Sequence, residues 1–243
     1  MESLVGRLAI VTGASSGIGK GVAVGLGRAG VTVIAVGRSA DRLGETCRAI
    51  STAGGIARPI QCDVTMESEV VAMFDAVESE NGPVDILVNS AGVFGGGLFE
   101  EITLIEWRRV LDVNLTGSFL CMREAMRNMR PRRRGRILNI GSISSFVPRP
   151  MSAPYAASKA GLVGLSRAAA IDGRDHGIAV GCLHPGNVAT EMRQTTDEPM
   201  NREPMMTVDD IAALAVAMLG IDAGATVWEL TALPIDQAYL GRG

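Results

Sequence analysis

Residues 12–19 read TGASSGIG, and this stretch decides the fold because it joins an apolar run to a helical pattern. The run LAIV at residues 8–11 is typical of a buried strand, and residues 17–29 have the period of a helix. Glycines at such a junction allow a sharp turn and a close approach of the backbone to a pyrophosphate, which the N-terminus of the helix favours. A lone glycine pattern also fits a plain tight turn, but its place in the first strand–helix unit predicts a dinucleotide-binding loop.

The rest of the chain alternates short apolar runs with longer helical patterns. Strands are expected near residues 7–11, 31–36, 56–61, 84–88, 136–140, 178–183 and 227–232. Helices are expected near residues 17–29, 39–53, 67–80, 104–129, 153–174 and 208–219. We therefore predict an α/β fold, a Rossmann-type doubly wound parallel sheet with helices on both faces. No linker or repeat divides the chain, so one domain is expected over residues 1–243.

The composition argues against several functional classes. The 243 residues carry 23 basic and 26 acidic side chains, a net charge of −3, which gives no electrostatic reason to expect nucleic acid as a partner. No apolar run is long enough to span a bilayer and no signal peptide is visible, so we expect no membrane partner and a cytoplasmic location. The four cysteines are scattered, and His176 and His184 lack a ligand pattern, so we expect reduced thiols and no metal.

A basic run, RPRRRGR, occupies residues 130–136 between a predicted helix and a predicted strand. It could contact an anionic ligand or nucleic acid. The simpler interpretation, which we adopt, is a solvated turn that interacts favourably with the C-terminus of the preceding helix.

Tyr155 and Lys159 form the pair with the most specific chemistry. They lie four residues apart in a predicted helix, so both side chains point from one face. A free phenol, with a pKa near ~10, is a poor acid or base at neutral pH, and a neighbouring ammonium lowers that pKa. The spacing fits a pair of residues that transfers a proton, but any amphipathic helix can carry Tyr and Lys at this spacing. Further catalytic residues elsewhere in the chain are needed to support this function.

The wide glycine spacing Thr-Gly-x-x-x-Gly-x-Gly resembles the short-chain dehydrogenase/reductase family, and the resemblance extends over essentially the whole chain. Asp63-Val64 follows the third predicted strand, and NSAG at residues 89–92 follows the fourth, where the family has Asn-Asn-Ala-Gly. Pro185-Gly186 follows the sixth strand. The cofactor contacts that the resemblance implies are Gly13, Ser15, Ser16, Gly17, Ile18, Gly19, Arg38, Ser39, Asp63, Val64, Asn89, Ala91, Gly92, Tyr155, Lys159, Pro185, Gly186, Val188 and Thr190.

The resemblance also implies a catalytic set, because Asn114, Ser142, Tyr155 and Lys159 occur in the order that the family requires. Tyr155 would be the general acid in carbonyl reduction and the general base in alcohol oxidation. Lys159 would lower the pKa of Tyr155 and bond the nicotinamide ribose, and Ser142 would position the substrate oxygen. Asn114 would hold a water that links Lys159 to solvent. Hydride would pass directly between the substrate carbon and the nicotinamide, so the scheme needs no metal.

The end of the second predicted strand bears on the choice of cofactor. NAD-dependent members of the family usually carry Asp at the position of Gly37, where a carboxylate bonds the ribose 2′-hydroxyl. Here Arg38 follows, and a guanidinium suits a 2′-phosphate, to which Ser39 could add a hydroxyl donor. We expect NADP(H) to be preferred over NAD(H). The glycine loop lacks a second basic residue at Ser15 or Ser16, so the preference could be partial.

Residues 187–207 are expected to form a substrate lid, since they follow the sixth strand beside the nicotinamide. The segment contains four methionines, which tolerate varied shapes, and two arginines that could meet a substrate carboxylate. The ending LPIDQAY at residues 233–239 resembles the family's branch of NADP-dependent 3-hydroxy acid or serine dehydrogenases. The family is mostly dimeric or tetrameric, which implies a homo-oligomer here.

Three readings follow from the resemblance. The first is an NADP-dependent oxidoreductase acting on a small ketone or secondary alcohol, 3-hydroxy acids among them. The second is a 3-oxoacyl carrier-protein reductase, for which residues 132–136 would have to dock the acidic carrier. The third is a non-catalytic NADP-binding regulator, which the retained Tyr155 and Lys159 disfavour. An epimerase or dehydratase would need a larger C-terminal domain.

Overall fold

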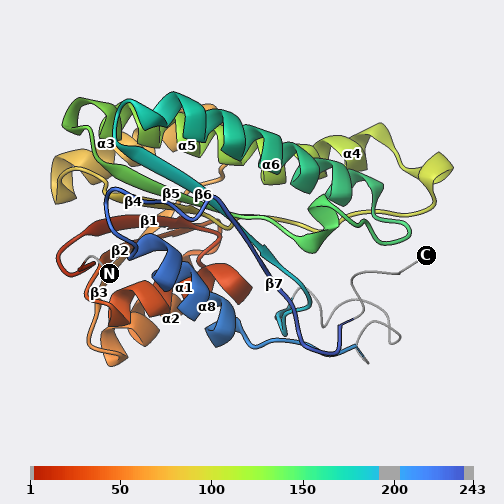
Figure 1. The fold of residues 1–243 in the computed structure, drawn as a ribbon, viewed down its shortest axis with the longest axis horizontal. Helices are drawn as coiled ribbons and strands as arrows, with labels where there is room; N and C mark the ends of the chain where they lie inside the picture. Colours follow the sequence, from red (N-terminus) through yellow and green to blue (C-terminus); the bar gives the residue numbers. More distant parts are fainter. Residues whose placement is uncertain (1–2, 192–202, 238–243) are drawn as a thin grey trace.

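The computed structural model describes residues 3–191 and 203–237 (Figure 1). The seven predicted strands form one parallel sheet in the order β3-β2-β1-β4-β5-β6-β7. Their bounds are β1 Leu8–Thr12, β2 Thr32–Gly37, β3 Ile56–Gln61, β4 Ile86–Asn89, β5 Gly135–Ile140, β6 Ile178–Pro185 and β7 Glu229–Ala232. The predicted doubly wound α/β fold is confirmed.

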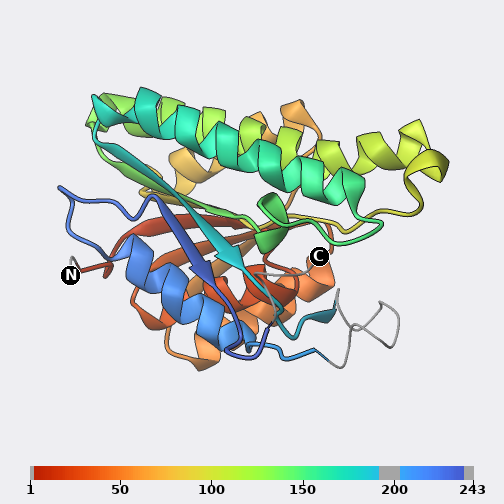
Figure 2. The ribbon, with the colours of Figure 1, turned by 45° about the vertical axis from the view of Figure 1, so that its right-hand side comes forward.

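Helices cover both faces of the sheet (Figures 1 and 2). One layer contains α1 (Gly17–Arg28), α2 (Ala40–Thr52) and α8 (Val208–Leu219). The opposite layer contains α3 (Glu67–Asn81), α4 (Leu104–Leu111), α5 (Gly117–Met129) and α6 (Ala153–Arg174). The helix expected over residues 104–129 is interrupted by a π-helical turn at Asp112–Thr116. Such turns are frequent at functional sites, and this one contains Asn114.

Two apolar cores lie on the two faces of the sheet, and β1 contributes to both. Ala9 and Val11 pack against the layer of α1 and α8, whereas Leu8 and Ile10 pack against the layer of α3 and α5. Successive side chains of a strand point to opposite faces, so a strand buried on both sides reads as a continuous apolar run. This explains why the pattern at residues 8–11 predicted the strand correctly.

The order of the strands reverses beside β1, because β2 and β4 lie on its two sides. Chain connections leave the carboxyl ends of β1 and β4 in opposite directions, which opens a crevice at that edge of the sheet. The expected dinucleotide loop follows β1 and the NSAG segment follows β4, so both reach this crevice.

The basic run at residues 130–136 lies at the amino end of β5, the end of the strand opposite the crevice. Arg136 is buried and donates hydrogen bonds to the carbonyl oxygens of Ile221, Asp222 and Ala225, just after α8. Arg132 forms an ion pair with Asp85 at 3.1 Å. The interpretation as a solvated turn is therefore wrong for these two arginines, because each one satisfies polar groups of neighbouring loops. It fits the other three, at positions 130, 133 and 134, which are exposed.

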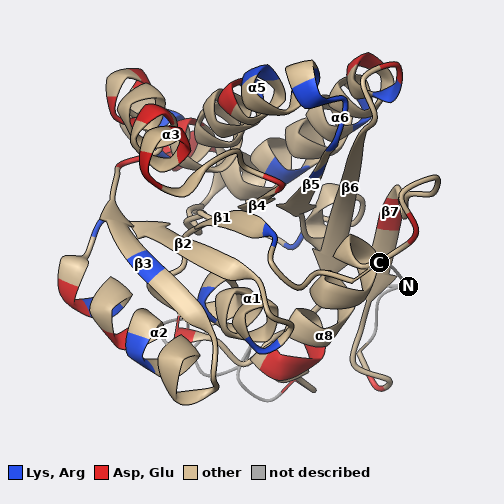
Figure 3. Cartoon of the chain, turned by 90° about the vertical axis from the view of Figure 1, so that its left-hand side faces the viewer, with Lys and Arg blue, Asp and Glu red and all other residues tan. Residues whose placement is uncertain are grey.

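Acidic and basic residues are interspersed on the outer helices α2 and α5 (Figure 3). Across residues 3–191 and 203–237, none of the helices has both the length and the apolar character needed to cross a membrane.

Candidate active site

Two cavities that share a wall occupy the carboxyl edge of the sheet. The larger, of about 360 Å³, extends from Arg38 at the end of β2 to Lys159 on α6. The smaller, of about 150 Å³, lies against Ser142 and the loop after β6. The residues that line both are Ile18, Gly141, Tyr155 and Thr190. Tyr155 therefore stands between a long cavity suited to a dinucleotide and a small cavity beside it.

The glycine loop is shaped to receive a pyrophosphate. Gly13 and Gly17 have φ of 67° and 50°, a region that favours glycine. A Cβ atom on Gly13 would lie 2.7 Å from the backbone nitrogen of Ala91, and one on Gly19 would overlap the carbonyl oxygen of Gly13. Helix α1 starts at Gly17, and the Ser16 side chain makes no capping hydrogen bond in the described structure. The first N–H groups of α1 are thus directed to the cavity, which fits a bound phosphate group.

Thr12 joins the glycine loop to the segment after β4. Its Oγ1 atom accepts hydrogen bonds from the backbone N–H groups of Ser90 at 3.1 Å and Ala91 at 3.2 Å. Two motifs that lie more than 70 residues apart are thereby held side by side, and both line the larger cavity.

Asn89 has a bracing position instead of the predicted cofactor contact. It is buried and does not line either cavity. Its Nδ2 atom donates a hydrogen bond of 2.9 Å to Oδ1 of Asn139, which ties β4 to β5. The structure therefore places Asn89 between the central strands and outside both cavities, away from the predicted cofactor contact.

The far end of the larger cavity contains Arg38 and Ser39, as expected, and also Arg42 on α2. Arg42 forms an ion pair of 2.5 Å with Glu191, which follows Thr190 on the other side of the cavity. Arg42 was not predicted as a site residue, although it lies in the first turn of α2, shortly after Arg38 and Ser39.

Tyr155 and Ser142 are brought together at the wall between the cavities. Burial raises the pKa of Tyr155, and a hydrogen bond with Ser142 opposes that shift. The Nζ atom of Lys159 lies 5.8 Å from the centroid of the Tyr155 ring. Burial is therefore the largest influence on the phenol in this structure, and the lowering of the Tyr155 pKa by Lys159 stays a prediction.

Asn114 is held by its neighbours on two segments. Its Oδ1 atom accepts a hydrogen bond of 2.8 Å from the backbone N–H of Val93, and its Nδ2 atom donates to the Val93 carbonyl oxygen at 3.0 Å. Nδ2 also donates to Oγ of Ser158 on α6 at 3.0 Å. The side-chain amide is thus occupied in joining the loop after β4 to α6, and it does not line either cavity.

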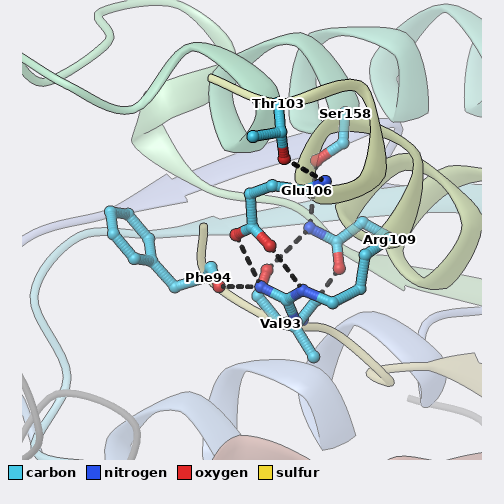
Figure 4. Close-up of polar contacts among 7 residues, drawn as sticks. Val93, Phe94, Thr103, Glu106, Arg109 and Ser158 are labelled. Atoms are coloured by element: carbon cyan, nitrogen blue, oxygen red, sulfur yellow. Dashed lines mark hydrogen bonds and ion pairs between the residues drawn. The ribbon is translucent and has the colours of Figure 1, made fainter. Parts of the chain in front are cut away.

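Phe94 belongs to the same loop and packs against Tyr155. Its ring centroid lies 5.2 Å from that of Tyr155, at an angle of 48°. Arg109 donates a hydrogen bond of 3.0 Å to the Phe94 carbonyl oxygen and is paired with Glu106 (Figure 4). Helix α4 therefore fixes the loop that places Phe94 in the wall of the smaller cavity.

The chain matches a known protein family. The family model for short chain dehydrogenases matches residues 7–201, most of the chain. The chain belongs to the short-chain dehydrogenase family. It is accordingly an oxidoreductase of the kind that interconverts CH–OH groups and ketones, in a family that uses NAD or NADP.

Three relatives show how widely the substrates of similar short-chain dehydrogenases vary. A 3beta-hydroxysteroid dehydrogenase 1 of Eggerthella lenta is 38% identical, over 93% of this chain and 91% of that protein. A cis-4-hydroxycyclohexanecarboxylate dehydrogenase of Sinomonas cyclohexanicum is 35% identical, over 93% and 94%. A crystal structure of an actinorhodin polyketide ketoreductase variant with NADPH superimposes with a TM-score of 0.89 at 31% identity, over 96% of this chain and 98% of that one.

The other predicted residues of this short-chain dehydrogenase divide between the two cavities. The larger is lined by Ser15, Asp63, Val64 and Gly92, as expected. Pro185, Gly186 and Val188 line the smaller cavity, on the far side of Tyr155. His184 packs on Phe146, with the two ring centroids 4.8 Å apart.

The predicted lid lies partly outside the described residues. Met192, Arg193, Met200 and Arg202 are among the undescribed residues, as are Ala238 and Tyr239 of the C-terminal motif. Val188 pairs with Met206 through a β-bridge, so the two ends of the lid segment lie side by side. The smaller cavity also contains Asn187, the first residue of the predicted lid, together with Phe94 and Arg149, which carry no local pattern and were not predicted.

Proposed function

We propose that this short-chain dehydrogenase interconverts a small secondary alcohol and its ketone with a preference for NADP(H) over NAD(H). The observation that carries the proposal is the position of Tyr155 in the wall shared by the two cavities, in contact with Ser142. A nicotinamide dinucleotide, when bound, supplies the hydride acceptor or donor. Gly13 to Gly19 would hold its pyrophosphate and Lys159 its nicotinamide ribose.

Each catalytic residue then has one task. Ser142 orients the substrate oxygen, and Tyr155 takes the proton from the alcohol hydroxyl or returns it to the ketone oxygen. Lys159 supplies positive charge beside Tyr155 and a route for the proton. The side chain of Asn114 keeps the loop after β4 against α6, as its bonds to Val93 and Ser158 suggest.

The preference for NADP(H) rests on Arg38 and Arg42 at the far end of the larger cavity. Two guanidinium groups beside Ser39 suit a 2′-phosphate, and Gly37 lacks the carboxylate that would repel it. The C-terminal motif, of which Gln237 is the last described residue, supports 3-hydroxy acids as the first substrates to test.

Turnover measurements on several substrates distinguish an oxidoreductase of small free compounds from a 3-oxoacyl carrier-protein reductase. NADPH oxidation is measured with β-keto acids, β-keto esters, acyl thioesters and simple ketones, and NADP-driven oxidation with serine and 3-hydroxy acids. We expect activity on the small free compounds. Activity on carrier-bound thioesters alone would favour the 3-oxoacyl reductase, for which the basic run at 130–136 gives no support because it lies at the opposite end of β5 from the site.

We further propose that residues 1–243 act as one domain, in the cytoplasm, as a homodimer or homotetramer. The four free thiols support a reducing compartment. Exposed apolar Ile105 and Phe119, on α4 and α5, are consistent with assembly through that layer. A mass measurement by light scattering, in which a monomer would contradict the proposal, tests the oligomeric state.

A further inference from the structure

Arg149 places a guanidinium in the wall of the smaller cavity. It lies on the loop after β5, seven residues beyond Ser142, and its side chain is only 16% exposed. Ser142 and Tyr155 line the same 150 Å³ cavity. Among the described residues that line it, Arg149 is the one with a positively charged side chain.

Two residues of the segment after β6 hold the guanidinium in place. Nη2 of Arg149 donates hydrogen bonds to Oε2 of Glu203 at 2.6 Å and to Oδ1 of Asn187 at 2.8 Å. Asn187 also donates to Oε2 of Glu203 at 2.6 Å, and its backbone N–H donates to Oε1 of Gln237 at 2.8 Å. Asn187 lines the cavity, whereas Glu203 is not among its lining residues.

We propose that Arg149 binds the carboxylate of a short hydroxy acid, or of the matching keto acid, and that Glu203 is the anion which this carboxylate displaces. The inference rests on the proposed function of the site. The planar fork of a guanidinium matches a carboxylate through two parallel hydrogen bonds. A largely buried cation without an anion is unfavourable, so Glu203 occupies that position until the substrate anion takes it.

The rest of the cavity determines the size of this acid. Its other walls are mainly apolar and fit a carbon chain; they are formed by Ile18, Phe94, Ile143, Pro185 and Val188. At about 150 Å³ this cavity has less than half the volume of the larger one, at about 360 Å³. A short chain therefore places its carboxylate at Arg149 and its hydroxyl at Tyr155 and Ser142. The relative named for cis-4-hydroxycyclohexanecarboxylate shows that a hydroxy acid is compatible with this fold.

If the substrate carboxylate replaces Glu203 at Arg149, substitutions of these two residues should have opposite effects on binding of the acid. Loss of the guanidinium weakens binding of the acid, whereas loss of the Glu203 carboxylate removes its competitor and strengthens binding of the acid. If the pair only joined two loops, both substitutions would act in the same direction. Glu203→Gln keeps the shape of the side chain and a hydrogen-bonding oxygen, so it separates the two possibilities.

The experiment compares racemic 3-hydroxybutyrate with its uncharged methyl ester, using the full chain and NADP. For Arg149→Met we expect the acid-to-ester ratio of kcat/KM to fall at least about tenfold, the loss of one or more charge-assisted hydrogen bonds. For Glu203→Gln we expect the KM for the acid to fall. Arg48→Met, an exposed arginine on α2, is the matched control and should leave the ratio unchanged. An unchanged ratio in Arg149→Met, or a higher KM for the acid in Glu203→Gln, overturns the proposal.

A binding measurement covers the case in which a variant folds poorly or no turnover is found. Butyrate should raise the melting temperature of the wild type more than butyramide does, and Arg149→Lys should reduce this difference. Equal effects of the two compounds on the wild type would also overturn the proposal. If butyrate binds through Arg149 but no alcohol or ketone is turned over, the proposed function fails while the anion site stands.

Discussion

Lys159 donates a hydrogen bond of 2.8 Å from its Nζ atom to the backbone carbonyl oxygen of Ile140, the last residue of β5. The ammonium is therefore held against the end of the central sheet, in the wall of the larger cavity. Burial lowers the pKa of Lys159 to about 8. This one contact links the position of α6, which carries Tyr155 and Lys159, to the pH dependence of stability.

Lys159 should make the free energy of unfolding rise with pH between about 8 and 10. In this window the unfolded lysine, with a pKa near ~10.4, holds more proton than the folded one, so raising the pH favours the folded state. The contribution is at most about 1 kcal/mol per pH unit. Denaturant unfolding of wild type and Lys159→Met at pH 8, 9 and 10 measures it, and parallel pH curves would contradict the prediction.

Two other buried groups, Cys182 and Tyr155, make stability fall as the pH rises. The Lys159 measurement therefore needs a control. Burial raises the pKa of Cys182 to about 11, partly opposed by Lys159, so the thiol lowers stability as the pH rises through the unfolded value of ~8.5. Tyr155, whose pKa is also raised by burial, acts in the same direction above ~10. The Lys159 comparison should therefore be repeated in a Cys182→Ala background.

Tyr155→Phe should abolish turnover while cofactor binding stays nearly intact. The substitution removes the proton donor and acceptor but keeps the ring that packs at 5.2 Å from Phe94. General acid–base groups contribute about 10²–10⁴ in rate, so kcat should fall by at least a factor of about 100. Single-turnover kinetics and NADPH fluorescence titration measure the two effects. Substantial remaining turnover would refute the role of Tyr155 in proton transfer.

Gly37→Asp combined with Arg38→Asp should shift the preference from NADP(H) toward NAD(H). A Cβ atom on Gly37 would lie 3.3 Å from Oγ of Ser15 and 3.5 Å from Cδ2 of Leu43, so a small adjustment admits the side chain. Losing a charged hydrogen bond of about 1.5–3 kcal/mol and adding repulsion should lower the NADP-to-NAD ratio of kcat/KM by at least about tenfold.

Three results bear on that cofactor prediction. An unchanged ratio would remove the assignment of Arg38 to the 2′-phosphate. Arg42→Ala alone should lower the same ratio, because Arg42 lines the same end of the cavity. Glu191→Gln should raise it, since it frees Arg42 from its ion pair with Glu191.

Arg136→Met should destabilise the fold by about 2–4 kcal/mol, because three carbonyl oxygens after α8 lose their charged donor, which is itself buried. Arg133→Ala, at an exposed position of the same basic run, is the control and should change stability by less than about 1 kcal/mol. Urea unfolding of both variants makes the comparison. Similar losses for both would show that the run acts as one charged surface.

The helices, the strands and the order of the reactive residues could be predicted from the amino-acid sequence alone. Continuous apolar runs marked the strands, and local spacing identified the glycine loop and the pair Tyr155 and Lys159. These features depend on neighbours within about one helical turn or one strand, so they are readable along the chain. The interruption of the helix at Asn114 was not readable, because a π-helical turn has no strong local signal.

Only the tertiary structure decided what surrounds those residues. Arg149 meets Glu203 across 54 positions, Arg42 meets Glu191 across 149, and Asn89 turns to Asn139 instead of to the cavity. The sign of the pKa shift of Tyr155 also depends on burial by distant segments. The walls of a site in an open parallel sheet come from loops that leave different strands, so their contacts are set by the order of the strands in space and not by distance along the chain.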